Sequence, residues 1–173
     1  MGGTTSSEGF EARDFPDRSG PSFKPAKNLG QKDFMLCDML SGNDHRGLCY
    51  VVTDPQLPDN PIVFASEGFC KNTGYAKEDI EGRNCRFLQG KETDPSDVEK
   101  IRKALDTETE ISLCLLNYRK DGSVFHNQFF LCPLREASGK TAYFLGVQVE
   151  VPVAAPGQQI MNPGWVYSMG LPA

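Results

Sequence analysis

The sequence predicts an α+β domain in which a five-stranded antiparallel sheet carries helices on one face. Three observations lead to this prediction. Segments with strand character occur first as a pair and later as a group of three, and short helical segments separate the two groups. Turns rich in Gly, Pro, Asp and Asn connect the strands within each group. The 173 residues suffice for one such domain with flanking segments.

The first two strands are predicted over residues 48–53 and 62–65, where β-branched and aromatic side chains are frequent. Residues 54–61 contain several prolines together with Asp and Asn, a composition that favours turns. Short helical pieces follow these strands, and glycines at positions 74, 82 and 90 interrupt them.

A longer helix is predicted to begin at Asp94-Pro95. An aspartate caps the first free backbone N–H groups of a helix, and proline fits the first helical position because its missing N–H is not needed there. The helix has one apolar stripe, formed by Val98, Ile101 and Leu105. Arg102 falls on the same stripe, where a lone arginine is more often a rim residue whose charged end stays in water.

Three strands complete the sheet, over residues 111–119, 124–133 and 142–151. Residues 120–122 read Lys-Asp-Gly and residues 137–140 read Ala-Ser-Gly-Lys, and both are turn sequences. Short turns between consecutive strands favour antiparallel pairing.

The flanks differ from the domain at residues 48–151. Residues 1–33 are rich in Gly, Ser, Pro and charge and are expected to form a flexible arm. Residues 34–47 begin with an amphipathic stretch and are expected to cap the domain. The tail, residues 152–173, contains so many Pro and Gly residues that a long helix is not expected. The start of the chain fits the loose pattern for N-myristoylation at Gly2, but a small-residue terminus is the more frequent explanation.

The composition narrows the function. The net charge is −5, so no basic stripe is present to neutralise phosphates, and a direct nucleic-acid partner is not expected. No apolar run approaches twenty residues, so a transmembrane segment is not expected. The six cysteines lack disulfide-framework or metal-site spacing, which favours reduced thiols and a cytoplasmic location.

Polar side chains occur where the sheet should be apolar. Asn117, Asn127 and Gln148 are in phase with the inward-facing apolar residues of the last three strands. Buried amides must be hydrogen-bonded, and a single one is commonly tied to backbone. Three on adjacent strands, facing a helix that carries Arg102, indicate a planar polar ligand inside the domain.

A thiol lies in a similarly polar setting. Residues 82–89 read Gly-Arg-Asn-Cys-Arg-Phe-Leu-Gln and place Cys85 between two arginines. Neither a disulfide nor a zinc site explains this cysteine, because it has no Cys or His partner at a suitable spacing. A planar, anionic ligand held close to the sulfur would explain it.

The octapeptide closely resembles the signature of the LOV family, the flavin-binding blue-light sensors within the PAS fold. The resemblance extends over about residues 48–151 and implies a PAS fold whose sheet and helices enclose a flavin. It implies that Asn117 and Asn127 bind the pyrimidine edge of the flavin ring and that Gln148 reaches N5 and O4. Arg86 and Arg102 resemble the family's phosphate clamp, a role that suits forked, permanently charged donors.

The remaining cofactor contacts follow from the same resemblance. Polar contacts to the ring or the ribityl chain are expected from Thr53, Asn60, Asn84 and Gln89. The apolar lining is expected from Val51, Leu88, Val98, Leu105, Leu115, Phe129, Leu131, Phe144 and Gly146. Family members that take FAD often carry an insertion between the cysteine helix and the arginine-bearing helix. Only residues 90–95 lie between them here, so FMN is favoured over FAD.

The resemblance also implies a mechanism. Blue light excites the flavin, the Cys85 sulfur adds reversibly to ring carbon C4a, and N5 gains a proton. N5 thereby changes from an acceptor to a donor, and the Gln148 amide can answer either state because it offers both an oxygen and an NH₂ group. Gln148 is therefore the expected signal switch. No substrate is turned over, so the protein is not expected to be an enzyme.

Two alternatives remain from the residues. In the first, the protein is a flavin redox sensor in which Cys85 reacts with an oxidant, and Arg86 lowers the pKa of its thiol. In the second, Cys85 is a hydrolase nucleophile, a weaker interpretation because His45 and His126 are both distant in sequence.

The outer face of the sheet is expected to be unusually apolar and to need a cover. Members of the family often have Trp before the first amide of the middle strand, whereas this chain has His126, which points outward together with Gln128. The cover is either one of the chain's own flanks, residues 34–40 or 165–167, or a second copy or partner protein whose binding changes in light. The surface residues expected to take part are Leu116, Tyr118, Phe130, Tyr143, Leu145 and Val147.

Overall fold

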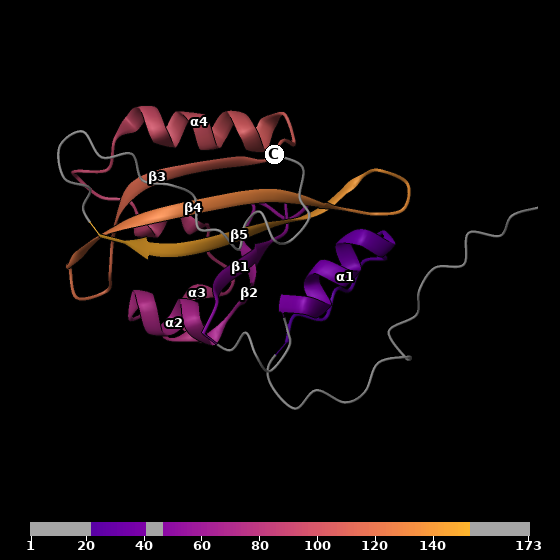
Figure 1. The fold of residues 1–173 in the computed structure, drawn as a ribbon, viewed down its shortest axis with the longest axis horizontal. Coiled ribbons are helices and arrows are strands. Elements are labelled where there is room, and N and C mark those ends of the chain that lie inside the picture. Colours follow the sequence, from indigo (N-terminus) through magenta and orange to yellow (C-terminus); the bar gives the residue numbers. More distant parts are fainter. Residues whose placement is uncertain (1–21, 41–46, 153–173) are drawn as a thin grey trace, which may run out of the picture.

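The computed structural model describes residues 22–40 and 47–152. In this part of the chain, five strands form one antiparallel sheet in the order β2-β1-β5-β4-β3 (Figure 1). The strands are β1 (Cys49–Thr53), β2 (Ile62–Ala65), β3 (Ile111–Tyr118), β4 (Val124–Arg135) and β5 (Thr141–Val151). The predicted α+β fold with a five-stranded antiparallel sheet is confirmed.

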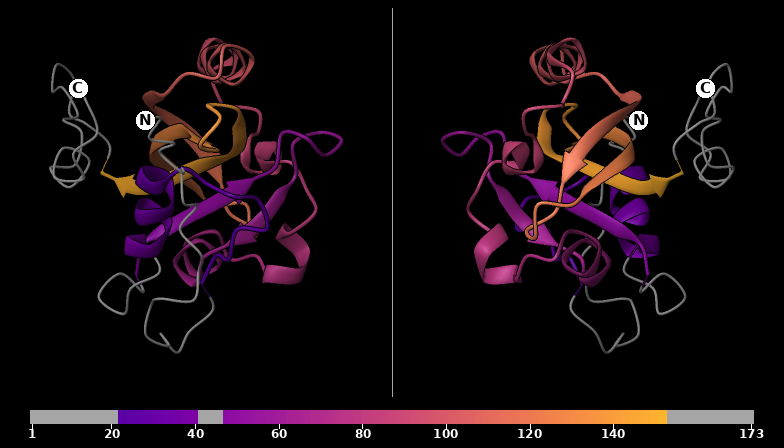
Figure 2. Two further views of the ribbon diagram at one scale, coloured as in Figure 1. Left: turned by 90° about the vertical axis from the view of Figure 1, so that its right-hand side faces the viewer. Right: turned by 90° about the vertical axis from the view of Figure 1, so that its left-hand side faces the viewer.

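Helices lie on both faces of the sheet. They are α1 (Gln31–Leu40), α2 (Glu67–Thr73), α3 (Lys77–Ile80), the 3₁₀ helix η3 (Cys85–Leu88) and α4 (Pro95–Asp106). The views in Figure 2 show α1 on one side of the sheet, α2 and α3 on the other, and α4 beyond the β3 edge. We call the face toward α2, α3 and η3 the inner face and the face toward α1 the outer face.

Local capping explains where α2 and α4 begin. Asp94 accepts a hydrogen bond from Ser96 N (2.8 Å) and Pro95 opens α4, as predicted. Ser66 caps α2 by accepting from Phe69 N (3.1 Å), and its hydroxyl also donates to Leu48 O (2.8 Å). Ser66 therefore joins the start of α2 to the chain that enters β1.

The chain's own N-terminal part covers much of the outer face. Three side chains of α1, those of Leu36, Cys37 and Leu40, belong to one buried cluster with outward-facing residues of the strands. This cluster includes four of the six predicted surface residues, Phe130, Tyr143, Leu145 and Val147. The flank 34–40 is thus the cover of this part of the sheet, and the predicted partner surface is correspondingly smaller.

The expected flexible arm over residues 1–33 needs correction at its C-terminal end. Helix α1 begins at Gln31, before the amphipathic stretch that was predicted to start at residue 34. Gly30 N donates to Arg135 O (2.8 Å), and Lys27 Nζ donates to Asp54 Oδ1 (2.6 Å) and to Ala142 O (2.9 Å). Residues 22–30 are therefore fixed to the sheet by specific hydrogen bonds.

The other predictions about the flanks concern residues outside the described ranges. These are the arm up to residue 21 with Gly2, residues 41–46 of the cap segment, and the tail beyond residue 152 with the proposed cover at residues 165–167. Every helix within residues 22–40 and 47–152 is too short or too polar to cross a membrane. The cytoplasmic location stays a prediction.

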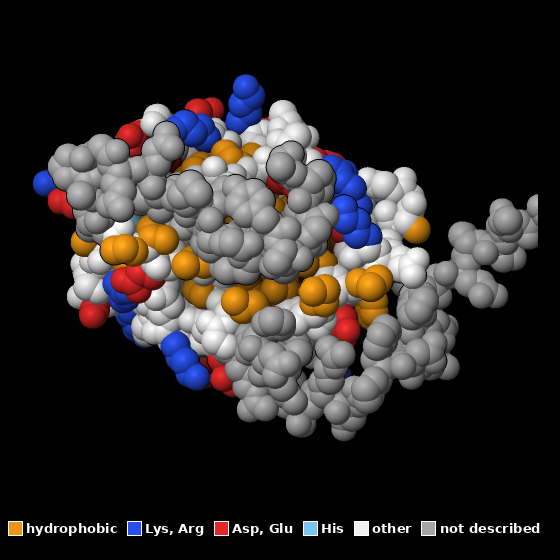
Figure 3. All heavy atoms as spheres, viewed as in Figure 1, with side chains coloured by type: hydrophobic (Ala, Val, Ile, Leu, Met, Phe, Trp, Pro, Cys, Tyr) orange, Lys and Arg blue, Asp and Glu red, His pale blue; other side chains and the backbone are white. Residues whose placement is uncertain are grey.

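The two remaining residues of the predicted partner surface, Leu116 and Tyr118, lie outside the cluster that α1 covers. Leu116 and Tyr118 are half-buried on the edge strand β3. The Tyr118 hydroxyl accepts from Glu92 N (3.0 Å), and its ring lies so close to Gly90 that a Cβ there would overlap it. The loop before α4 therefore packs against the Tyr118 side chain. A band of hydrophobic side chains is nevertheless visible across this side of the molecule (Figure 3).

Candidate functional site

A small cavity lies on the inner face of the sheet. Its volume is about 50 Å³, and its walls come from η3, α4 and the strands β3, β4 and β5. It is lined by Cys85, Leu88, Gln89, Ile101, Leu115, Asn117, Asn127, Phe129 and Gln148. All of these except Ile101 were predicted to contact a flavin. Ile101 lies on the predicted apolar stripe of α4, so its spacing was the signal that would have identified it.

The three amides meet at this cavity, as the strand alternation predicted. Asn127 Nδ2 donates to Asn117 Oδ1 (2.9 Å) and to Gln148 Oε1 (3.3 Å). Asn117 Nδ2 in turn donates to Leu88 O (3.2 Å) and to Leu116 O (3.2 Å). All three amides are almost fully buried. A hydrogen-bonded chain of polar groups thus crosses three adjacent strands in an otherwise apolar layer.

This side of the sheet also carries unsatisfied acceptors. Within the described residues, three buried side-chain oxygens have no hydrogen-bond partner, namely Thr53 Oγ1, Asn60 Oδ1 and Asn127 Oδ1. Burying a polar atom without a partner is costly, and such atoms are rare in folded proteins. All three belong to residues predicted to bind the cofactor. A ligand with N–H and O–H donors, such as a flavin with its ribityl chain, fits this pattern.

Cys85 begins η3 and faces the same cavity. Asn84 positions this turn, since its Oδ1 accepts from Arg86 N (3.0 Å) and its Nδ2 donates to Asp59 O (2.7 Å). The residue keeps some exposed surface, but burial raises the pKa of the Cys85 thiol to about 12. This shift is opposite in direction to the lowered thiol pKa that would help the redox alternative.

The two arginines of the predicted phosphate clamp form ion pairs with different carboxylates. Arg86 forms a bidentate pair with Asp59, with both N–O distances at 2.6 Å, and these hydrogen bonds lower the pKa of Asp59. Arg102 pairs with Glu99 at 2.6 Å on the surface of α4. All four side chains are well exposed. The structure does not bring the guanidinium groups together, so the clamp stays a prediction.

The predicted apolar residues that do not line the cavity divide into two groups. Those on the sheet, Val51, Leu131, Phe144 and Gly146, lie in paired, buried positions of β1, β4 and β5. Those on α4, Val98 and Leu105, are only half-buried, and Ala104 is the one buried residue of that helix. A Cβ at Gly146 would lie 3.0 Å from the Phe129 ring, so a glycine at this position avoids a steric clash with the ring.

The incomplete burial of α4 bears on the size of the cavity. Sites for cofactors usually measure about 300–1,000 Å³, and about 50 Å³ is too small for a three-ring system. A helix with one buried residue can move outward at little cost, because few apolar contacts are lost. The lining chemistry therefore identifies this site better than its volume. A larger cavity on the outer face shares none of these residues.

Comparison with known proteins agrees with this geometry. A family model described as a PAS domain matches residues 47–151. A solved light-oxygen-voltage (LOV) domain from a study with a flavin analogue has a TM-score of 0.65 and 49% sequence identity, and the match covers 72% of this chain and 90% of that one. The chain is a LOV domain of the PAS family.

Other similar proteins include a much longer chain and a photoreceptor dimer. Phototropin-1A of Oryza sativa subsp. japonica is 54% identical over 101 residues, which cover 58% of this chain and 11% of the phototropin. The light-state dimer of the fungal blue-light photoreceptor Vivid has a TM-score of 0.58 and 34% identity, covering 60% of this chain and 78% of that one. This LOV domain thus spans a small part of the phototropin that it matches.

Proposed function

We propose that this LOV domain is a blue-light sensor that binds FMN at the inner face of the sheet and uses Cys85 as its photoreactive group. The observation that supports this most strongly is the meeting of Cys85 with the buried amide chain in one cavity. The unsatisfied oxygens beside that chain are the second support. The names of the relatives, which include a phototropin and a blue-light photoreceptor, agree with it.

The protein's side chains would each have a defined part. When bound, the flavin supplies the absorption of blue light and a ring carbon, C4a, that a thiol can attack. Asn117 and Asn127 offer their free hydrogen-bonding capacity to the polar edge of the ring. The neutral thiol of Cys85, kept protonated by its raised pKa, would offer the bound flavin both a sulfur and a proton from the wall of the cavity. Substrate turnover has no part in this proposal.

The type of flavin is proposed from the loop between η3 and α4. Thr93 Oγ1 donates to Leu116 O (2.7 Å) and accepts from Gly90 N (3.0 Å), so this short loop is tied along the β3 edge. An adenine group beyond the phosphate would need room that a tied loop does not provide. FMN is therefore favoured over FAD.

The phosphate of FMN would be held by Arg86 and Arg102, after each leaves its present carboxylate partner. Both ion pairs are exposed, and exposed ion pairs contribute little net stability because water screens them. A dianionic phosphate can form charge-assisted hydrogen bonds with both guanidinium groups and would compete well for them. The present pairing of Arg86 and Arg102 is thus compatible with the clamp.

The signal is proposed to leave the site through β5. Gln148 lies on its inner face and, one residue before it, Val147 packs on the outer face in the cluster that contains Leu36 and Leu40 of α1. A changed hydrogen bond at the Gln148 amide would shift β5 and so alter the packing of α1. Release of α1 would expose Phe130 and its neighbours for a second copy or a partner protein. The light-state dimer of Vivid supports an output of this kind.

The cofactor site is tested by titrating the purified, flavin-free protein with FMN and with FAD. Asn127→Leu should weaken FMN binding by about 10- to 100-fold, because a buried hydrogen-bonding group is lost from the site. Gln128→Leu is the matched control, since this neighbouring amide bonds Ser112 on the opposite face (3.1 Å) and should leave the affinity unchanged. Equal effects of the two changes, or tighter binding of FAD than of FMN, would contradict the proposal.

A further inference from the structure

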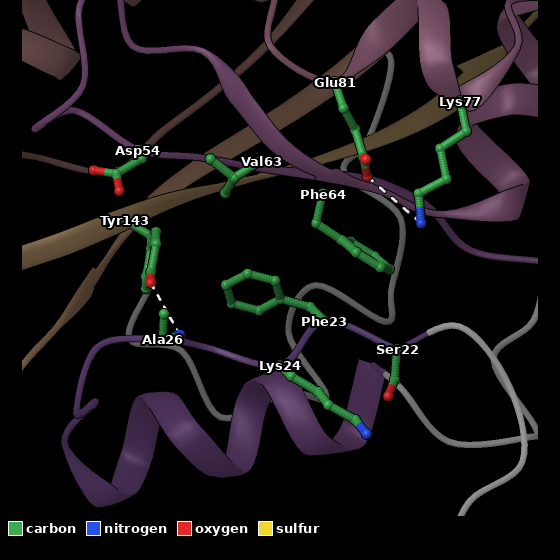
Figure 4. Close-up of a pocket in the computed structure, with 10 residues that line it drawn as sticks. All are labelled: Ser22, Phe23, Lys24, Ala26, Asp54, Val63, Phe64, Lys77, Glu81 and Tyr143. Atoms are coloured by element: carbon green, nitrogen blue, oxygen red, sulfur yellow. Dashed lines mark hydrogen bonds and ion pairs between the residues drawn. The ribbon is translucent and has the colours of Figure 1, made fainter.

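A second cavity lies on the outer face, apart from the LOV cofactor site. Its volume is about 450 Å³, which is within the range of ligand-sized sites. It is lined by Ser22, Phe23, Lys24, Ala26, Asp54, Val63, Phe64, Lys77, Glu81 and Tyr143. Figure 4 shows side chains from residues 22–26 on one side of this cavity and from β2, α3 and β5 on the others.

Aromatic rings form the apolar part of this outer cavity. Phe23 packs against Phe64 with ring centroids 5.8 Å apart and edge-on against Tyr143 at 5.2 Å. The Tyr143 hydroxyl accepts from the backbone N–H groups of Ala26 and Lys27, at 3.2 Å each, which fixes the wall made by residues 22–26. Rings arranged in this way bind a further aromatic side chain well, because edge and face contacts are both available.

Charged groups surround the rings. Lys24 is exposed and lines the cavity, and Lys77 lies 4.9 Å from the Phe64 ring centroid and 3.5 Å from Glu81. Asp54 is already paired with Lys27 at 2.6 Å. The nearest charges that an incoming group could meet therefore include two ammonium groups, which favours an occupant that carries carboxylates beside its aromatic ring.

The segment of this chain that directly precedes the cavity has this chemistry. Residues 1–21 end directly before Ser22, which is a lining residue of the cavity. They contain Phe15 with Asp14 before it and Asp17 two positions after it, and in total four carboxylates against two guanidinium groups. The stretch between Phe15 and Ser22 spans up to about 24 Å when extended, and the Gly20-Pro21 dipeptide favours a turn within it.

We propose that Phe15 docks into the outer cavity against Phe23, Phe64 and Tyr143, with Asp14 and Asp17 facing Lys24 and Lys77. The N-terminal segment then continues the cover that residues 22–40 provide on this face. Phe10 is the other phenylalanine of residues 1–21 and also lies between two carboxylates, Glu8 and Glu11, but it requires a longer loop to close. Pro16 further restricts the backbone beside Phe15, so less conformational entropy is lost on docking.

The test is an NMR experiment on the full chain in the dark, with isotope-labelled Phe and Tyr. Nuclear Overhauser contacts are expected between the Phe15 ring and the Phe64 and Tyr143 rings. Phe15→Ala should remove these contacts and shift the ring signals of Phe64 and Tyr143. Phe10→Ala is the matched control and should leave both signals in place. The experiment does not depend on flavin binding or on light.

The outcomes separate the possible occupants. Contacts that occur within one molecule and vanish with Phe15→Ala support the proposal. Contacts that occur only between differently labelled molecules assign the cavity to a second copy and overturn it. Ring signals that stay unchanged in Phe15→Ala, or that respond to Phe10→Ala instead, also overturn it, and then an unlinked aromatic anion becomes the occupant to test.

Discussion

At the scale of single residues, Cys85 and the amide chain determine what this LOV domain can do. The thiol is neutral over the physiological range because burial raises its pKa to about 12. The nearby Arg86 does not oppose this, since its guanidinium group is paired with Asp59. Reaction with the excited flavin can begin from a neutral thiol, whereas reaction with an oxidant requires the thiolate. The residue environment therefore favours light sensing over redox sensing.

Alkylation of the flavin-free protein tests this environment. At pH 7.5, Cys85 should react with iodoacetamide at least about a hundredfold more slowly than a free cysteine, because the reactive thiolate is scarce. The rate should rise about tenfold per pH unit from pH 8 to 11, below the raised pKa. The neutral thiol stabilises the fold below pH about 9, and this contribution is lost as pH rises through about 12. Peptide mapping by mass spectrometry measures the labelling rates, and the half-exposed Cys114 is the internal control. Rapid labelling of Cys85 would contradict a buried, neutral thiol.

Gln148 is the residue whose change should separate photochemistry from signalling. Gln148→Leu should still bleach under blue light, since Cys85 is intact, but a leucine cannot exchange its hydrogen bonds when N5 gains a proton. The expected result is loss of the light-induced change in hydrogen exchange of residues 22–40, measured by mass spectrometry. Exchange in this variant that responds to light as in the parent protein would exclude β5 as the signalling strand.

These residue positions could be predicted to different extents. The amides were predicted because period-2 alternation places Asn117, Asn127 and Gln148 on one face regardless of distant contacts. The partner of Arg86 could not be predicted, because the Asp59 carboxylate comes from a loop whose residues 59 and 60 adopt positive φ angles of 67° and 45°. A conformation of this kind depends on tertiary contacts and leaves little trace in sequence patterns.

At the scale of elements, the strands and α4 carry local signals, whereas α1 depends on its surroundings. Asp94-Pro95 fixes the start of α4 through a cap within the same segment. The start of α1 is held from elsewhere, since Asp33 Oδ2 accepts from Arg135 N (2.7 Å) on β4. The expectation of a flexible arm up to residue 33 failed for this reason. Composition alone did not reveal that residues 22–33 pack on the sheet.

The role of α1 as the outer-face cover predicts a difference between its two sides. Leu36 is 8% exposed and Met39 is 49% exposed. Leu36→Ala should lower the free energy of unfolding by about 2–4 kcal/mol, because it removes buried methyl groups and leaves a cavity. Met39→Ala, the control on the solvent side of the same helix, should cost less than about 1 kcal/mol. Urea unfolding measures both, and equal values would mean that α1 does not cover the sheet in solution.

At the scale of the whole molecule, two layers meet across one sheet. The inner layer holds Cys85, the amide chain and the unsatisfied oxygens, and the outer layer holds α1 and the aromatic cavity. β5 belongs to both, because its neighbouring residues alternate between them. The sequence predicted both faces of the sheet, but it left open whether the chain or a partner covers the outer one. Only the positions of α1 and residues 22–30 decided this for the described residues.

The most direct test of the central claim is the absorption spectrum of the flavin-loaded protein before and after blue illumination. The account predicts that the blue absorption band of the flavin disappears on illumination, returns in the dark, and no longer responds in Cys85→Ala. Bleaching that persists in Cys85→Ala, or that recovers only when an oxidant is added, would contradict the assignment of Cys85 as the photoreactive group.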